Sequence, residues 1–334
     1  MRAKLSPQAA ASFAGMTKRW RIGLGIAAAL AVAGSAGAAP RPNAADPEAN
    51  IVEELVVTAR HPAPAWWRVE KDGSTVWILG VLDTPIPPDV PWRRDDLEGR
   101  LKGANSLIVG ERLQANLGDL FGLIGLWTQL RSKPAMEDAL APKLRARFVA
   151  ERTKLGKGPE PYAHWRPMVA GQILLRDARP AGSLEVGRQI RAAANKAGVS
   201  VHPAGQYDLV PFARTALASM TPAKEGECLN AALDDAEAGA DAFRAAAVGW
   251  ARGDIAAAIK APRHFDRCLL LMAGGPDLWR RSTDDQADAI VKALETPGHA
   301  VAVAPLRRLL AKDGLIDTLT ARGLKVIGPA DDAP

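Results

Sequence analysis

One stretch decides the fold: residues 66–83, which read WWRVEKDGSTVWILGVLD. Residues 66–71 are rich in aromatic and β-branched side chains and predict a strand. Asp72-Gly73 is a pair that closes two-residue hairpin turns, because both positions accept a positive φ. A second, more apolar strand follows and ends beside a lone carboxylate, Asp83. The stretch therefore predicts a hairpin and a first candidate residue for a functional site.

Further strands are predicted by short apolar runs bounded by Gly, Pro or Asp, with helical patterns between them. Such alternation favours an α/β sheet. From about 211 to 295 the strand signal almost disappears, and Ala-rich helix formers dominate. We therefore predict one α/β domain over 65–330, with a mixed sheet built from 65–112 and 298–328 and a large helical insertion at 113–297. The runs are residues 76–80, 107–110, 199–202, 300–304 and 325–327.

Residues 1–38 have the three parts of a signal peptide. Basic residues at 18–21 precede the apolar stretch Ile22–Gly34, which is too short for a membrane-spanning helix of about 20 residues. Ala36-Gly37-Ala38 then forms a small-x-small cleavage site. We expect cleavage after Ala38 and a periplasmic or secreted protein, with an uncleaved N-terminal anchor as the alternative.

Export changes the charge of the chain. Of 43 Lys and Arg residues, five lie in residues 1–38, which hold no acidic residue, so 38 remain against 37 acidic residues. The mature chain would thus be nearly neutral. A nucleic-acid partner needs a basic face that this composition does not provide, and we expect no nucleic-acid binding.

The chain has two cysteines, Cys228 and Cys268. Exported chains fold in an oxidising compartment, where cysteines pair. We therefore expect a disulfide between them rather than two buried free thiols. Closing a loop of this length would contribute about 4 kcal/mol in the chain-entropy model.

Residues 39–64 are expected to be a linker that contains one short extended segment. Residues 39–50 are rich in Pro, Ala, Asn and Asp, which is typical of a flexible linker. Residues 51–60, IVEELVVTAR, are β-branched and extended, and they resemble a short segment near the mature N-terminus of TonB-dependent outer-membrane receptors. Such a segment can add to an exposed sheet edge, which would make it a docking strand for an energy-transducing partner. A first strand or a tether is the simpler interpretation.

From Trp66 onward the chain resembles the TraB/GumN/Tiki family. The family has an apolar strand that ends in Gly-x-x-His, a second strand that ends in Glu, a helix that ends in Trp-Ala-x-Gly-Asp, and a closing Gly-x-x-His-Leu pattern before a valine strand. Together these blocks are fairly specific, and singly each is weak. The corresponding segments here are 80–83 (GVLD), 106–111 (SLIVGE), 250–254 (WARGD) and 300–326, with further likeness at 165–167 (WRP) and 182–185 (GSLE).

Three departures from the family pattern concern its site. The first histidine falls on Asp83, the closing histidine on Arg308, and the closing glycine on Pro305, so that only the glutamate is matched, at Glu111. In the family these positions are thought to form one site, and Tiki members are reported as metal-dependent proteases. Asp83 can still bind a hard cation through oxygen. Arg308 cannot be a ligand, because a guanidinium has no acceptor. A site with two histidine ligands is therefore not available.

The residues themselves lead to the same grouping once the resemblance supplies the order of the strands. Asp83, Glu111 and Arg308 each lie just beyond an apolar strand, and in open α/β sheets ligand sites form outside the carboxyl ends of the strands. If the three strands are parallel neighbours, the side chains converge into a neutralised cluster, with the guanidinium roughly where a divalent ion would lie. The alternative is that each is an ordinary solvated loop residue.

The sequence thus predicts an exported envelope protein with a degenerate metal-hydrolase site and no cofactor, acting by binding a peptide, a polysaccharide or an envelope partner. The alternative is an active metal-dependent hydrolase or peptidase in which Asp83 and Glu111 hold a divalent metal or act as general acid and base. Whether the protein is an enzyme stays open, as does peripheral association with a membrane.

Overall fold

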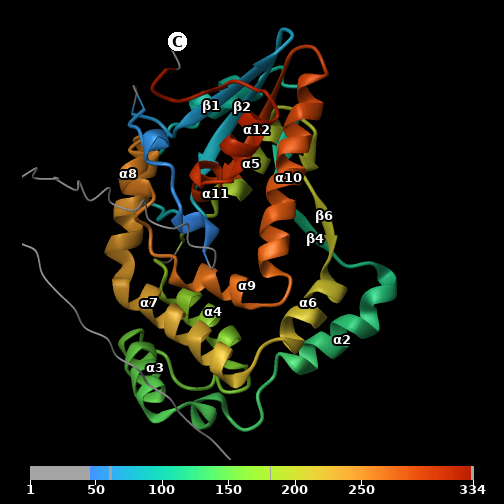
Figure 1. The fold of residues 1–334 in the computed structure, drawn as a ribbon. Coiled ribbons are helices and arrows are strands. Elements are labelled where there is room, and N and C mark those ends of the chain that lie inside the picture. The colour runs from blue at the N-terminus through green and yellow to red at the C-terminus, as the bar shows by residue number, and fades with distance from the viewer. Residues whose placement is uncertain (1–45, 60–61, 181, 332–334) are drawn as a thin grey trace, which may run out of the picture. The chain divides into compact units, whose positions relative to one another are not determined.

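The structure is a computed structural model that describes residues 46–59, 62–180 and 182–331 (Figure 1). The expected signal peptide, its cleavage site at Ala38 and the beginning of the expected linker lie outside the described residues. The strands and helices counted below lie within these residues.

The central sheet is mixed and has six strands in the order β5-β3-β7-β2-β1-β8. Strands β2, β3, β5 and β7 run parallel, while β1 is antiparallel to both of its neighbours. This confirms the α/β fold. Five strands come from the two ends of the domain, and β5 joins them from the middle of the chain. The bounds are β1 (Trp66–Lys71), β2 (Ser74–Val81), β3 (Leu107–Val109), β5 (Val201–Pro203), β7 (His299–Pro305) and β8 (Val326–Ile327).

The predicted hairpin is present. Asp72 and Gly73 both have positive φ, 50° and 80°, and Lys71 pairs with Ser74 across the turn. Strand β2 is central, and its apolar side chains are buried except for Trp77, which is partly buried. Gly80 is required by packing, because a Cβ there would lie 2.8 Å from both Leu306 and Trp67. The carboxyl end of β2 is thereby held tightly against the start of the helix that follows β7.

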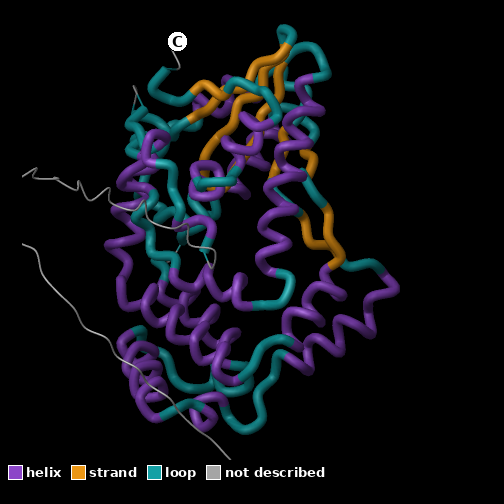
Figure 2. Tube along the Cα trace, viewed as in Figure 1, coloured by secondary structure: helices purple, strands orange, loops and turns teal. Residues whose placement is uncertain are grey.

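The described residues also contain twelve α-helices, most of them between β3 and β7. Helix α10 packs on β2, β3 and β7 with α12 beside it, whereas α1 contacts both β7 and α5. In Figure 2 the strands of the main sheet lie on one side of the described part of the molecule, and many helices of the insertion lie on the opposite side. The helices are α1 (Asp95–Leu101), α2 (Leu120–Gln129), α3 (Pro142–Lys154), α4 (Pro167–Ala178), α5 (Val186–Lys196), α6 (Leu209–Ala218), α7 (Pro222–Ala251), α8 (Ile255–Ala258), α9 (Arg267–Leu271), α10 (Gly275–Leu294), α11 (Leu306–Leu310) and α12 (Leu315–Ala321).

The helical part is organised around α7. This helix is interrupted at Gly239, whose φ of 79° is not helical, and it packs against α3, α4 and α8. Cys228 of α7 and Cys268 of α9 lie at bonding distance, with their Cα atoms 5.2 Å apart, so the expected pairing is present. The disulfide ties α9 and the loop before it to α7. None of the helices in the described part is both long and apolar enough to cross a membrane.

A second, two-stranded parallel sheet was not predicted from the sequence. Strands β4 (Arg112–Gln114) and β6 (Gln206–Asp208) pair with each other and lead into α2 and α6, which also pack together. Both strands have only three residues, too few for the period-2 pattern to stand out. In Figure 1 these four elements form a side arm, which we define as residues 112–133 and 206–218.

The segment 46–59 was expected to be part of a linker, and in the structure it lies against the domain. Ile51 and Thr58 form isolated β-bridges with Ala311 and Asp254. Apolar side chains at 55–57 pack on the main core. Burial of these side chains gives the segment a physical reason to stay in place. For it to act as a docking strand it would first have to be released.

Candidate functional site

Three neighbouring parallel strands bring the predicted site residues to one edge of the sheet. In the order β3-β7-β2, strand β7 lies in the middle. Glu111 comes two residues after β3, Asp83 two residues after β2, and Arg308 lies in α11, which directly follows β7. Arg308 is thus placed between the two carboxylates, as expected from the topology of an open α/β sheet.

Arg308 is bound to Glu111 through a small polar network. Its Nη1 lies 3.2 Å from Oε2 of Glu111 and donates to Oγ of Ser282 at 2.6 Å. The Ser282 hydroxyl in turn donates to Oε2 of Glu111 at 2.6 Å. Burial disfavours the ionised carboxylate, but Arg308 and the Ser282 hydrogen bond outweigh it and hold the pKa of Glu111 below its ordinary value of 4.5. Glu111 is therefore ionised at neutral pH, and its carboxylate is already bound by Arg308 and Ser282.

Asp83 behaves differently. Asp83 is exposed to solvent, and it lines a cavity whose walls partly desolvate its carboxyl group. This desolvation, with the nearby Glu48 and Asp266, raises the pKa of Asp83 to about 7, although Arg308 and Arg263 oppose the shift. The ion pairs of Arg308 are with Glu111 and Glu48 and do not include Asp83. Asp83 is therefore a carboxyl group that exchanges its proton near neutral pH.

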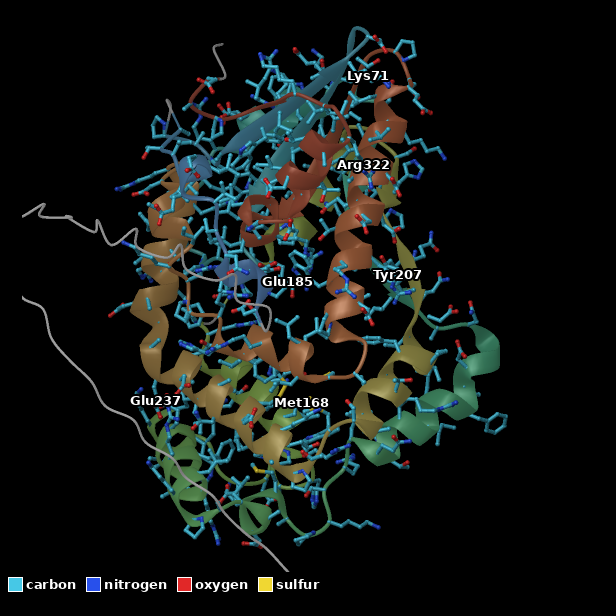
Figure 3. The ribbon with its side chains drawn as sticks, viewed as in Figure 1. Lys71, Met168, Glu185, Tyr207, Glu237 and Arg322 are labelled. Carbon is cyan, nitrogen blue, oxygen red and sulfur yellow. A yellow bond between two sulfur atoms is a disulfide. The ribbon has the colours of Figure 1, made fainter. Side chains whose placement is uncertain are left out.

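The cavity has a volume of about 720 Å³ and lies between the sheet edge and the helical part. Acidic, basic and apolar side chains all reach it, and Met168 and Glu185 among them are labelled in Figure 3. Its lining residues include the acidic Glu48, Asp83, Glu185 and Asp266, the basic Arg176, Arg179, Arg263 and Arg308, and the apolar Met168, Leu175, Phe265, Leu269, Leu270 and Met272.

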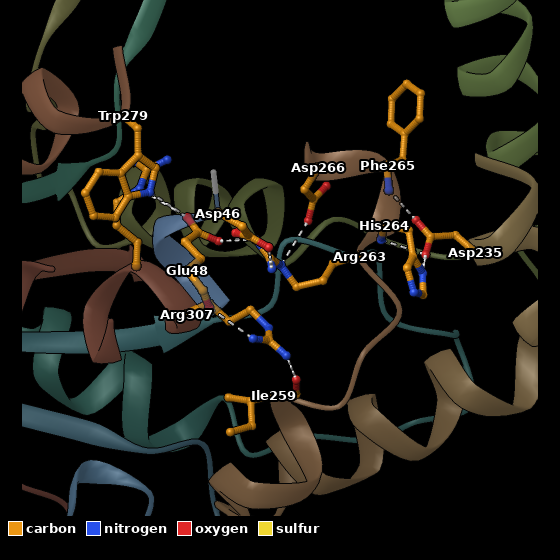
Figure 4. A network of polar contacts seen from close by, with 11 residues as sticks. Asp46, Glu48, Asp235, Ile259, Arg263, His264, Phe265, Asp266, Trp279 and Arg307 are labelled. Atoms are coloured by element: carbon orange, nitrogen blue, oxygen red, sulfur yellow. Dashed lines mark hydrogen bonds and ion pairs between the residues drawn. The ribbon is translucent and has the colours of Figure 1, made fainter. Parts of the chain in front are cut away.

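The N-terminal segment contributes to the cavity, which sequence reasoning missed. Arg263 binds both carboxylate oxygens of Asp46, at 2.7 and 2.9 Å, and its Nη2 lies 3.3 Å from Glu48 (Figure 4). The indole of Trp279 donates to Oε1 of Glu48 at 3.0 Å, and the Nε of Arg308 lies 3.7 Å from the same oxygen. Two buried carboxylates thus form ion pairs with the arginine side chains of the site. No motif marks residues 46–48, so only their acidic character could have hinted at this.

The loop that carries Arg263 and Asp266 is fixed by Asp235 of α7. The carboxylate of Asp235 accepts hydrogen bonds from the backbone N–H groups of His264 and Phe265 at 2.8 and 2.9 Å (Figure 4). Asp266 follows at the cavity wall. Burial, partly offset by Arg263, raises its pKa to about 6, although half of its side chain remains accessible to solvent. Asp83 and Asp266 are therefore two titrating carboxyls in one cavity.

A divalent metal of the kind that the family resemblance implies does not fit these residues. Among the described residues, no three His, Cys, Asp or Glu side chains are placed to hold a metal ion. The one matched glutamate, Glu111, already binds Arg308 and Ser282. A guanidinium at this position also repels a cation. The positions that correspond to the family's site thus lack both imidazoles, and the matched carboxylate is already bound by Arg308 and Ser282.

Comparison with known proteins identifies a family for this chain. The family model described as TraB/PrgY/gumN family matches residues 65–327, which is most of the chain. No curated protein and no solved structure matches the chain.

Proposed function

Since the chain belongs to the TraB/PrgY/gumN family, we propose that it is an exported envelope protein that uses the family fold for binding, with a degenerate metal-hydrolase site. The observation that carries the proposal is Arg308. It stands where the family's closing histidine would be, and it holds Glu111 with Ser282. The Arg308–Glu111 pair carries no net charge, so the ionised glutamate is compensated without a metal ion.

The cavity has the chemistry of a ligand pocket. Pockets are mostly apolar, with a few convergent polar groups that fix the orientation of the ligand. Here one wall is apolar, through Phe265, Leu269 and Met272, while Asp83 and Asp266 present oxygen atoms. Hydroxyl and amide donors of a peptide or polysaccharide fragment can hydrogen-bond to these oxygens. The proposed ligand is therefore such a fragment, or a segment of an envelope protein that contains it.

Binding is tested by narrowing the cavity. Gln172 lines it from α4 and is otherwise exposed, so Gln172→Trp fills space without disturbing the core. Calorimetric titration with envelope-derived peptides and oligosaccharides should show a ligand that the wild-type chain binds and Gln172→Trp does not. The control is Ala150→Trp, an exposed position on α3 outside the lining, which should bind normally. Equal binding by both variants would refute the cavity as the site.

Export is part of the same proposal and is supported by the sequence of residues 1–38 alone. Protein recovered from the periplasm or medium should begin at Ala39. N-terminal sequencing that finds Met1 on the folded protein would contradict it.

A second candidate function is favoured by the position of Asp83 and Asp266 in one cavity, where burial raises the pKa of Asp83 to about 7. A carboxyl that titrates near the working pH is suited to general acid–base catalysis. The partner carboxyl in the cavity would be Asp266, because Glu111 is occupied by Arg308. Protonated Asp83 would give its proton to the leaving group, and ionised Asp266 would take one from the attacking water. If the wild type hydrolyses a peptide or glycan and the Asp83→Asn variant does not, the protein is a hydrolase and does not act by binding alone.

A further inference from the structure

Large apolar side chains are exposed on one helix of the side arm. Leu120, Phe121, Ile124 and Trp127 of α2 are 52–84% accessible to solvent, and Phe121 is the most exposed of them. Their spacing of three and four residues places them in one stripe along the helix. We call this stripe the α2 face. Of seven exposed large hydrophobic side chains among the described residues, four belong to it.

Helix α2 is apolar on both sides. Its sequence, LFGLIGLWTQ, contains no charged residue. The inner side, with Leu123 and Leu126, packs into the cluster that α6 also joins. A helix that is apolar all round is normally buried all round. The α2 face is therefore a surface that something else covers, since a contiguous exposed apolar patch marks an interaction site.

The side arm that carries the α2 face has more basic than acidic residues. The side arm contains four basic residues, Arg112, Arg131, Lys133 and Arg214, and two acidic ones. The guanidinium of Arg131 lies 4.8 Å from the ring centroid of Trp127 and 4.3 Å from that of Trp165. It is thus held against aromatic rings at the edge of the apolar stripe. The strength of binding to a membrane surface increases with the apolar area that is buried and with the attraction of basic residues to anionic lipids, and the side arm offers both.

We propose that the α2 face inserts into the surface of an anionic phospholipid membrane. A second copy of the chain fits less well, because stable interfaces need about 20–30 residues on each side, and the α2 face offers four. Shallow insertion of a few apolar side chains, assisted by basic residues, is sufficient for reversible membrane binding. The proposal is independent of what the cavity binds.

The test is sedimentation of the chain from Ala39 onward, which keeps every described residue, with phospholipid vesicles. We expect binding to an equimolar mixture of phosphatidylglycerol and phosphatidylcholine, weaker binding to phosphatidylcholine alone, and loss of binding as salt is added. Phe121→Glu should reduce the partition coefficient by about tenfold or more, because it replaces the outermost apolar group by a charge. Arg112→Gln should reduce only the preference for the anionic vesicles.

The matched control is Leu184→Glu, which makes the same change in charge at an exposed apolar residue outside the side arm. It should bind like the wild type. Absence of binding to either vesicle, or an equal loss in Phe121→Glu and Leu184→Glu, would overturn the proposal. So would analytical ultracentrifugation that finds a dimer in the absence of lipid which Phe121→Glu dissociates, since the α2 face would then contact a second copy.

Discussion

Replacing Arg308 by alanine should destabilise the fold, and the structure sets the scale. The Arg308 side chain is only 12% accessible to solvent, and Glu111 is 27% accessible. The variant would remove the guanidinium from Glu111 and Ser282 and leave a partly buried carboxylate with fewer partners. Exposed ion pairs contribute about 0–1 kcal/mol, whereas breaking a buried pair costs about 3–5 kcal/mol. This intermediate burial predicts a loss of about 1–3 kcal/mol in the free energy of unfolding.

Urea denaturation at several pH values measures this loss in the free energy of unfolding and tests whether it comes from the ion pair with Glu111. The lowered pKa of Glu111 means that its ionisation stabilises the folded state above the ordinary value of 4.5. That contribution disappears as pH falls through the folded-state pKa, because Glu111 is then protonated in both states. The difference in the free energy of unfolding between wild type and Arg308→Ala should therefore be largest at pH 7 and decrease at acidic pH.

The control for this prediction is Arg322→Ala. Arg322 pairs with Asp288, but both side chains are more exposed, at 29% and 70%. Its loss should cost no more than about 1 kcal/mol. If Arg308→Ala is no more costly than Arg322→Ala, or if its cost is the same at every pH, then the Arg308 cluster is an ordinary surface feature and the reasoning fails.

Two further predictions concern the cavity, and a third concerns the disulfide. Asp83→Asn should make the protein more stable at pH 8 and not at pH 4. The reason is that the pKa of Asp83 is raised from 3.8 to about 7 in the folded state, so the wild type loses stability as pH rises between these values. Urea denaturation at both pH values measures this difference, and an equal effect at both would contradict the prediction. Glu48→Gln should lower the pKa of Asp83, measured by carboxyl NMR titration, because Glu48 helps to raise it; an unchanged pKa would show that desolvation alone acts. Reducing Cys228–Cys268, which spans 40 residues, should lower the free energy of unfolding by about 4 kcal/mol in the chain-entropy model, and reduction without any loss of stability would refute that role.

The sequence predicted the sheet because its signals are local. The Asp72-Gly73 turn and the apolar runs of β2 and β7 depend on neighbouring residues alone, and β7 pairs with β2 over seven residue pairs. The grouping of Glu111 with Arg308 followed from strand order, which the family resemblance supplied.

The rest of the site depends on contacts between distant segments. Asp46 and Glu48 meet Arg263 across more than 200 residues, and nothing in their local composition distinguishes them from a solvated linker. Ser282 lies inside α10, where a small polar residue carries no signal of its own. Asp266 lines the cavity from a loop whose backbone is held by Asp235, a residue 31 positions earlier in the chain. Such pairings arise from tertiary packing and not from a pattern in the chain.

The most direct test of the central claim is elemental analysis of the purified, unmodified protein. A site in which Arg308 binds Glu111 leaves no place for a divalent cation, and we predict no stoichiometric zinc, manganese or cobalt. One equivalent of any of these metals, lost when Asp83 is changed to Asn or Glu111 to Gln, would contradict the account and establish a metal-dependent hydrolase site instead.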